Sequence, residues 1–151
     1  MIDRFEKLTA GTSRIYKSIQ RIKKYQMSQF GMKSTHVMCI HYLDTHPDGL
    51  TGADLCRLCG EDKSGVSRIL SDLEKQQLIC YAPGHEAKKY RARALLTDTG
   101  KEYAEEIHKL ILHATLKGGQ GISDTEREIF YRVLFRISEN LEQLCMMPDE
   151  S

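Results

Sequence analysis

The sequence has no long apolar run, few prolines and no low-complexity segment. None of its apolar runs approaches the length of a membrane span. Only three prolines are spread over the 151 residues, and there is no internal repeat. The first residues, MIDRFEKL, lack the basic-then-apolar order of a signal peptide. We therefore expect a cytoplasmic chain of one domain, long enough to bury a core, with no membrane association.

The sequence also lacks the residue sets of catalysis and metal binding. It has no nucleophile–base constellation, no phosphate-cradling glycine loop and no paired carboxylates in a recognisable setting, so we expect no enzyme and no cofactor. Its five cysteines are an odd number without framework spacing, which indicates reduced thiols. Cys56 and Cys59 form a lone C-x-x-C, and a zinc site needs a second close pair. They are interpreted as small core residues, and no metal is predicted.

Charge is small in total but uneven along the chain. The net charge is +4 over residues 1–50, +2 over residues 51–96 and −5 over residues 97–151. We therefore expect a polyanion to bind the middle of the chain and not its end.

One stretch, Asp62 to Leu78, has the pattern of an amphipathic helix with an unusual outer face. Its apolar residues form one stripe: Val66, Ile69, Leu70, Leu73 and Leu78. The opposite face carries Lys63, Ser64, Ser67, Arg68, Ser71 and Lys75. Short donors and one long bidentate donor fit a groove about 12 Å wide, and Gly65 leaves room for close approach. A surface helix rich in serine by chance is the alternative interpretation.

Further helices are predicted on both sides of this stretch. A long helix over residues 1–30 ends at Gly31, and Ser34 is the expected N-cap of a second helix. Thr51 caps a short third helix that ends at Gly60. A fifth helix runs from Thr97 to Lys117, and the capping box of Ser123 and Glu126 opens a sixth.

A β-hairpin is predicted directly after the central helix. Leu78–Tyr81 and Arg91–Leu96 have strand patterns, and Pro83-Gly84 with a polar loop separates them. The hairpin is basic, with Lys88, Lys89, Arg91 and Arg93 against Glu86. A helix-turn-helix followed by such a hairpin is the order of a winged helix. A solvated hairpin tip is the alternative interpretation of the charges.

The last helix carries more apolar surface than one stripe needs. Its apolar residues are Ile129, Phe130, Val133, Leu134, Ile137, Leu141 and Leu144. A small chain can cover a second apolar face with a partner copy. We therefore predict a mainly α fold with a small β-hairpin wing. Within one domain, 1–151, residues 34–96 form the winged helix-turn-helix, 97–117 connect it, and 1–30 with 118–147 form a dimerisation layer.

In this order and spacing, the segments resemble the MarR family of bacterial transcription regulators. Gly31–Leu43, Leu50–Ile79 and Leu95–Glu102 carry the resemblance, and Asp62–Ile79 is its most specific part. The resemblance implies a winged-helix homodimer that binds a pseudo-palindromic operator in double-stranded DNA. The recognition helix would enter the major groove and the wing an adjacent minor groove. It further implies a repressor that a small aromatic or phenolic effector releases.

Matched residue by residue, the resemblance assigns roles on the recognition helix. It places Ser64, Ser67 and Arg68 at base-facing positions, and it makes Lys63 and Ser71 phosphate contacts.

The wing departs from the family pattern. The family's Asp-x-Arg tip falls on Lys88-Lys89-Tyr90, so the Asp is absent and the ion pair that stiffens many such wings is in doubt. Lys88, Lys89 or Arg91 remains available for the groove-reaching role.

Two other functions stay open from the sequence. One is a cysteine-based redox-sensing regulator, although neither Cys39 in an apolar helix nor Cys80 in a strand has the basic, exposed setting of a reactive thiol. The other is a winged-helix protein-interaction module without DNA binding. The basic wing and Arg68 argue against the second.

Overall fold

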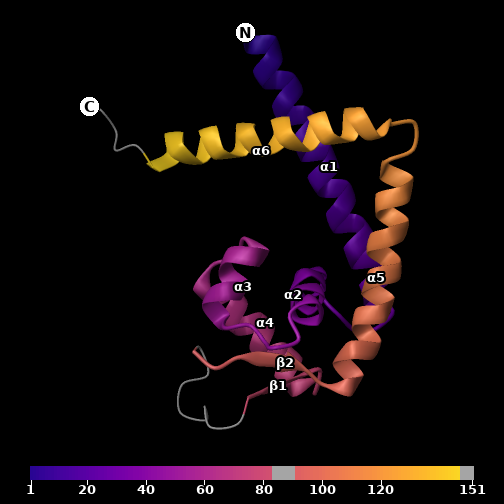
Figure 1. The fold of residues 1–151 in the computed structure, drawn as a ribbon, viewed down its shortest axis with the longest axis vertical. Helices are drawn as coiled ribbons and strands as arrows, with labels where there is room; N and C mark the ends of the chain where they lie inside the picture. The colour runs from indigo at the N-terminus through magenta and orange to yellow at the C-terminus, as the bar shows by residue number, and fades with distance from the viewer. Residues whose placement is uncertain (83–90, 147–151) are drawn as a thin grey trace. The chain divides into compact units, whose positions relative to one another are not determined.

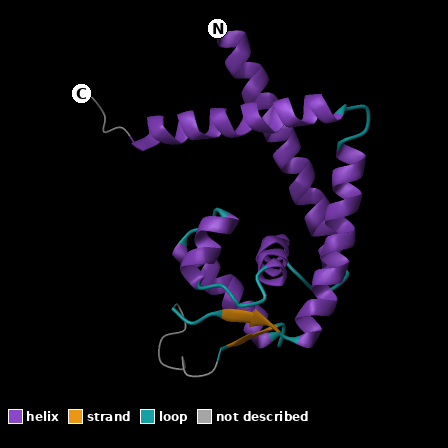
Figure 2. Cartoon of the chain, in the orientation of Figure 1, coloured by secondary structure: helices purple, strands orange, loops and turns teal. Residues whose placement is uncertain are grey.

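The computed structural model of the chain describes residues 1–82 and 91–146 (Figure 1). Its helices are α1 (Ile2–Ser28), α2 (Ser34–Thr45), α3 (Gly52–Cys59), α4 (Lys63–Lys75), α5 (Asp98–Gly118) and α6 (Asp124–Met146). Its strands are β1 (Ile79–Tyr81) and β2 (Ala94–Leu96). Figure 2 shows the helical character of the described chain and the short hairpin beside α4. The predicted mainly α fold with a small hairpin is confirmed.

The chain divides into two units, Met1–Leu112 and His113–Ser151, with the boundary inside α5. The prediction of one domain with a dimerisation layer stays a prediction. Among the described residues, no helix is both long and apolar enough to cross a lipid bilayer.

The hairpin of the first unit is antiparallel and shorter than predicted. Ile79 pairs with Leu96, Cys80 with Leu95 and Tyr81 with Ala94. Leu50 adds an isolated bridge to Ala94, with N···O distances of 3.1 and 2.8 Å. The second strand was expected from Arg91, but β2 begins at Ala94. Arg91 therefore lies in the loop before the strand.

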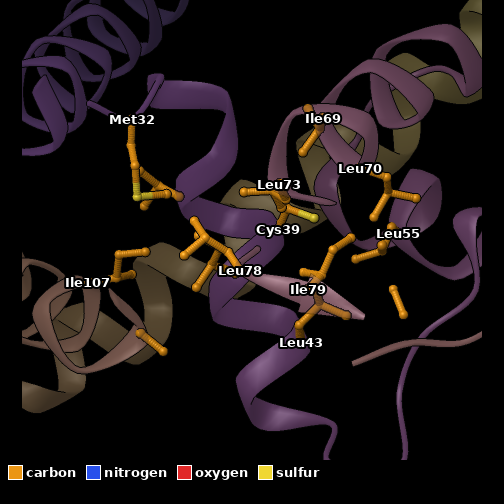
Figure 3. Close-up of a cluster of buried hydrophobic side chains, with 14 of the residues drawn as sticks. Met32, Cys39, Leu43, Leu55, Ile69, Leu70, Leu73, Leu78, Ile79 and Ile107 are labelled. Carbon is orange, nitrogen blue, oxygen red and sulfur yellow. The ribbon is translucent and has the colours of Figure 1, made fainter. Parts of the chain in front are cut away.

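The core of the first unit lies between α2, α3, α4, the hairpin and the first half of α5 (Figure 3). The predicted stripe of α4 is buried at Val66, Ile69, Leu70 and Leu73. Leu78 is also buried, but it lies outside the helix, which ends at Lys75. Gln77 adopts a φ of 58°, and this left-handed turn redirects the chain so that Leu78 still faces the core.

The helix starts follow local capping, with one correction. Thr51 Oγ1 accepts from the Asp54 N–H, and an Asp54 carboxylate oxygen accepts from the Thr51 N–H at 3.0 Å. Gly60 ends α3 in the left-handed conformation, as predicted. Ser34 was expected to be the N-cap of α2, but Lys33 holds that position and Ser34 is the first helical residue. His36 is the third helical residue, and its ring Nδ1 accepts from the N-cap N–H of Lys33 at 3.4 Å, the role that a Glu or Gln side chain takes in a capping box.

The second unit contains α6, which opens with the predicted capping box. Ser123 Oγ accepts from the Glu126 N–H, and a Glu126 carboxylate oxygen accepts from the Ser123 N–H at 2.9 Å. No residue of α6 is buried. Large apolar side chains remain exposed along it, and they include Ile129, Phe130, Tyr131, Val133, Phe135, Leu141 and Leu144.

Candidate nucleic-acid interface

The outer face of α4 is exposed to solvent in the described chain. Burial of the stripe from Val66 to Leu73 turns the opposite face outward. All six residues predicted there are exposed: Lys63, Ser64, Ser67, Arg68, Ser71 and Lys75. Ser64 and Arg68 are four residues apart and therefore lie on the same face. The structure thus brings together the helix residues that the sequence singled out.

The first turn of α4 is anchored by a side-chain cap. Asp62 Oδ1 accepts from the Gly65 N–H at 2.6 Å. A Cβ at Gly65 would lie 3.1 Å from both Asp62 Oδ1 and Glu61 Oε2. Gly65 therefore has a local reason for its size, besides the close approach suggested by the sequence. The small residue keeps the capping carboxylate next to the helix N-terminus.

The turn between α3 and α4 is short and held at both ends. Gly60 has φ 66° and ψ 28°, and its N–H bonds the Cys56 carbonyl. Asp62, the N-cap of α4, follows two residues later. An eight-residue helix, a tight turn and a thirteen-residue helix reproduce the helix-turn-helix arrangement.

The basic wing is only partly within the described residues. Lys88 and Lys89 lie outside them. Arg91 is exposed and stands three residues before β2. Arg93 is engaged within the fold, since its Nη1 donates to the Gly49 carbonyl at 3.1 Å. Of the described wing cations, Arg91 is therefore the better candidate for a contact with DNA.

A polar cluster that sequence reasoning missed joins α2 to α4. Lys33 Nζ lies 2.7 Å from Asp72 Oδ2, and the same oxygen lies 3.4 Å from His36 Nε2. The lysine hydrogen bond holds the pKa of Asp72 below its usual value. Burial lowers the pKa of His36, so its neutral form is favoured. These partners are almost forty positions apart in sequence, and no local spacing could have indicated them.

Two further histidines meet where α2 contacts α5. The rings of His41 and His108 lie edge to face, with centroids 5.5 Å apart. His108 Nε2 is 3.4 Å from Asp44 Oδ2. Among the described residues, no group of three or more His, Cys, Asp or Glu side chains is arranged to hold a metal ion.

The lone C-x-x-C pair lies against the core. Cys56 and Cys59 are half-buried and pack on the buried cluster that contains Cys39. The interpretation of these cysteines as small core residues agrees with that packing.

Comparison with known proteins identifies the winged-helix segment. Residues 30–86 match the model of the MarR family. No curated protein matches the sequence.

Solved structures resemble the whole fold. A transcriptional regulator named PA3341 is 24% identical with a TM-score of 0.74, covering 92% of this chain and 98% of that one. A MarR family regulator from Listeria monocytogenes, complexed with a 26mer DNA, is 16% identical with a TM-score of 0.77, covering 88% and 87%. The S. aureus MepR–DNA complex is 22% identical with a TM-score of 0.77, covering 86% and 93%. At these identities the likeness shows the fold.

Proposed function

Because this chain has the MarR-family winged-helix fold, we propose that it is a sequence-specific, double-stranded DNA-binding transcription regulator. The observation that carries the proposal is the exposed face of α4, where Ser64, Ser67 and Arg68 stand opposite a fully buried stripe. Two of the similar structures are complexes with DNA.

The chemistry of this face suits a major groove better than bulk solvent. Serine hydroxyls donate and accept at short reach, so they let the helix backbone come close to base edges. The guanidinium of Arg68 extends further and can meet a guanine through two parallel N–H donors. Lys63 and Ser71 flank this group and are proposed to contact phosphates, which position the helix without reading sequence.

The proposed active form is a homodimer on a pseudo-palindromic operator. Support comes from the apolar side chains that α1 and α6 leave exposed within one chain. A twofold dimer presents two copies of α4, and an operator with matching symmetry follows from that geometry.

The proposed mode of regulation is repression, relieved by a small aromatic or phenolic effector. This part is supported by the family resemblance alone. Binding of such a compound should be detectable as a rise in melting temperature together with release of bound DNA.

The test is selection of bound sequences from a random double-stranded DNA pool, followed by titration of the selected site against salt. We expect enrichment of a two-half-site sequence and an affinity that falls steeply with salt. A variant in which Ser64, Ser67 and Arg68 are all alanine should enrich no sequence, whereas Lys117→Ala at the end of α5 should select the same site as the wild type. A folded wild-type protein that enriches nothing would exclude the proposal and leave a protein-interaction module as the alternative.

A further inference from the structure

Lys33, where α2 begins, is held both at its backbone and at its side chain. Its N–H donates to His36 Nδ1 at 3.4 Å, and its carbonyl accepts from the His36 N–H at 3.0 Å. Its Nζ donates to Asp72 Oδ2 in α4 at 2.7 Å. The ring of His36 is buried, with 1% of it exposed. Lys33 is therefore a surface lysine whose position the core of the first unit supports.

Asp72 places the Lys33 ammonium beside the exposed face of α4. Asp72 comes four residues after Arg68 and eight after Ser64, so the three side chains follow one row along the helix. The Asp72 side chain is 30% exposed and precedes the buried Leu73, so it lies at the edge of that face, where α2 packs against α4. The ammonium therefore lies about one helical turn beyond Arg68, although it comes from another helix.

The Lys33 ammonium keeps donors for an acceptor outside the chain. An ammonium carries three N–H donors, and within residues 1–82 and 91–146 the acceptor that it bonds is Asp72. The Lys33 side chain is 70% exposed, so the remaining donors are open to solvent. A free lysine loses side-chain entropy when it binds a ligand, and the bond to Asp72 reduces that loss. Lys33 is thus a preorganised cation.

We propose that Lys33 contacts a DNA phosphate next to the bases that α4 meets, and that Asp72 is the residue that positions it. The proposal rests on the proposed function, in which α4 enters the major groove. Asp72 by itself would repel DNA, because its carboxylate carries the same sign of charge as a phosphate. Paired with Lys33, it instead directs a cation to the groove wall. Such a contact fixes how the helix sits on the duplex and carries no sequence information.

The first measurement is the affinity of Lys33→Ala for the selected site over a range of salt concentrations. Losing the contact should weaken binding roughly tenfold and lower the slope of log affinity against log salt by about one unit per half-site. The weakening should be equal on operators changed one position at a time. Lys33→Arg keeps the charge and should restore most of the affinity.

Lys109→Ala is the matched control for this variant. Lys109 is also an exposed lysine paired with a carboxylate, since its Nζ lies 2.6 Å from Glu106 Oε1, but both residues belong to α5. Its replacement should leave the affinity and the salt slope as they are in the wild type.

The second measurement separates positioning from charge alone. If only charge mattered, Asp72→Ala would strengthen binding, because it removes a carboxylate near DNA. We expect it to weaken binding about threefold or more, because Lys33 is no longer held beside Arg68. Asp72→Glu should retain most of the affinity. In the Lys33→Ala background, Asp72→Ala should strengthen binding, since only the repulsion is left to remove.

Thermal unfolding of each variant separates a DNA contact from a structural role. An exposed ion pair adds little to stability, so Lys33→Ala should melt near the wild-type temperature while its salt slope falls. If Asp72→Ala does not fold, Asp72→Asn takes its place with the same expected direction, because its amide oxygen can still accept from His36.

Two outcomes would overturn the proposal while the wild type binds its selected site. An unchanged salt slope in Lys33→Ala would remove Lys33 from the interface, and tighter binding by Asp72→Ala alone would reject the positioning role. A folded wild type that binds no DNA would instead reject the proposed function, and this inference with it.

Discussion

At the residue scale, substitution of Arg68 tests whether the exposed face of α4 contacts bases or only phosphates. Its guanidinium shares the exposed face of α4 with Ser64 and Ser67, and a planar fork suits the O6 and N7 atoms of guanine. Arg68→Ala should weaken binding by about 1–3 kcal/mol per contact and relax preference at one base pair in each half-site. Arg68→Lys should restore the loss only in part, because an ammonium cannot donate two parallel bonds.

The measurement is a comparison of both variants on operators changed one position at a time. Arg132→Ala in α6 is the matched control and should bind as the wild type does. Equal weakening on every operator would make Arg68 a phosphate contact and leave base reading to the serines.

His36 gives a prediction for stability against pH. Its ring is 1% exposed, and burial lowers its pKa in the folded state. The unfolded chain therefore binds a proton more readily than the folded chain. The free energy of unfolding should be greatest above the unfolded pKa of about 6.5 and should fall as the pH drops below it towards the lower folded pKa.

Denaturant titrations of the wild type and His36→Gln from pH 8 to pH 5 would measure this effect. The variant should lose part of the pH dependence in that interval. The carboxylate of Asp72, whose pKa is also lowered, acts at more acidic pH. Parallel pH curves for the two proteins would show that His36 does not control this window.

At the element scale, Gly100 determines how closely α5 starts against the hairpin. A Cβ at this position would collide with the Leu78 carbonyl oxygen and lie 3.2 Å from Leu96 Cδ2. The same carbonyl accepts the Thr97 N–H at 3.0 Å, so it cannot move away freely. Gly100→Ala should destabilise the fold by roughly 1–3 kcal/mol.

Thermal unfolding is the measurement, with Gly118→Ala as control, since a Cβ there meets nothing within 4 Å. The control should be neutral or slightly stabilising. An equal melting temperature for wild type and Gly100→Ala would mean that the start of α5 is not packed as described.

The wing is expected to contribute electrostatic, sequence-tolerant affinity. Arg91 is exposed beside β2, and Lys88 and Lys89 precede it in sequence. Removing a phosphate contact should reduce the slope of log affinity against log salt by about one unit. Arg91→Ala and the double variant of Lys88 and Lys89 to Ala can be compared with Lys117→Ala. An unchanged slope would remove the replaced residues from the interface.

Local signals were enough to predict most elements, because caps and apolar stripes act within a few residues. Thr51, Gly60 and Ser123 marked helix ends where the structure has them. The predicted helix ran to Leu78, past the end of α4 at Lys75, because no local sequence signal indicates the left-handed turn at Gln77. The start of α2 differs by one residue, because Lys33 and not Ser34 is its N-cap and the ring of the buried His36 accepts from the Lys33 N–H.

Contacts between distant segments could not be predicted in the same way. The exposed face of α4 follows from its own stripe, so its candidate site residues were accessible from sequence. The cluster of Lys33, His36 and Asp72 depends on how α2 packs against α4. That packing is a property of the folded core, and single-sequence periodicity does not contain it.

At the scale of the whole molecule, the exposed apolar side chains predict a dimer. In α1, Phe5, Ile15 and Ile19 are 65%, 52% and 43% exposed, and Leu144 in α6 is 65% exposed. Sedimentation at micromolar concentration should give twice the chain mass of 17.3 kDa. Leu144→Glu should shift the protein towards monomer, because it puts a charge into the proposed interface.

The matched control is Gln143→Glu, which adds the same charge at a neighbouring polar position. It should sediment as the wild type does. A compact wild-type monomer at these concentrations would refute the dimer and the twofold operator with it.

The bare surface of α6 has a consequence for how such a regulator would respond to its own abundance. A helix of 23 residues with none of them buried gains little from its own chain, and isolated helices are marginal in water. If a second copy supplies the missing cover, folding of this helix and pairing of two chains become one event. At low expression, the population able to occupy a twofold operator would then grow with the square of the number of chains. Genetic dosage would therefore set a threshold, and small changes in synthesis or proteolysis would be amplified at the promoter.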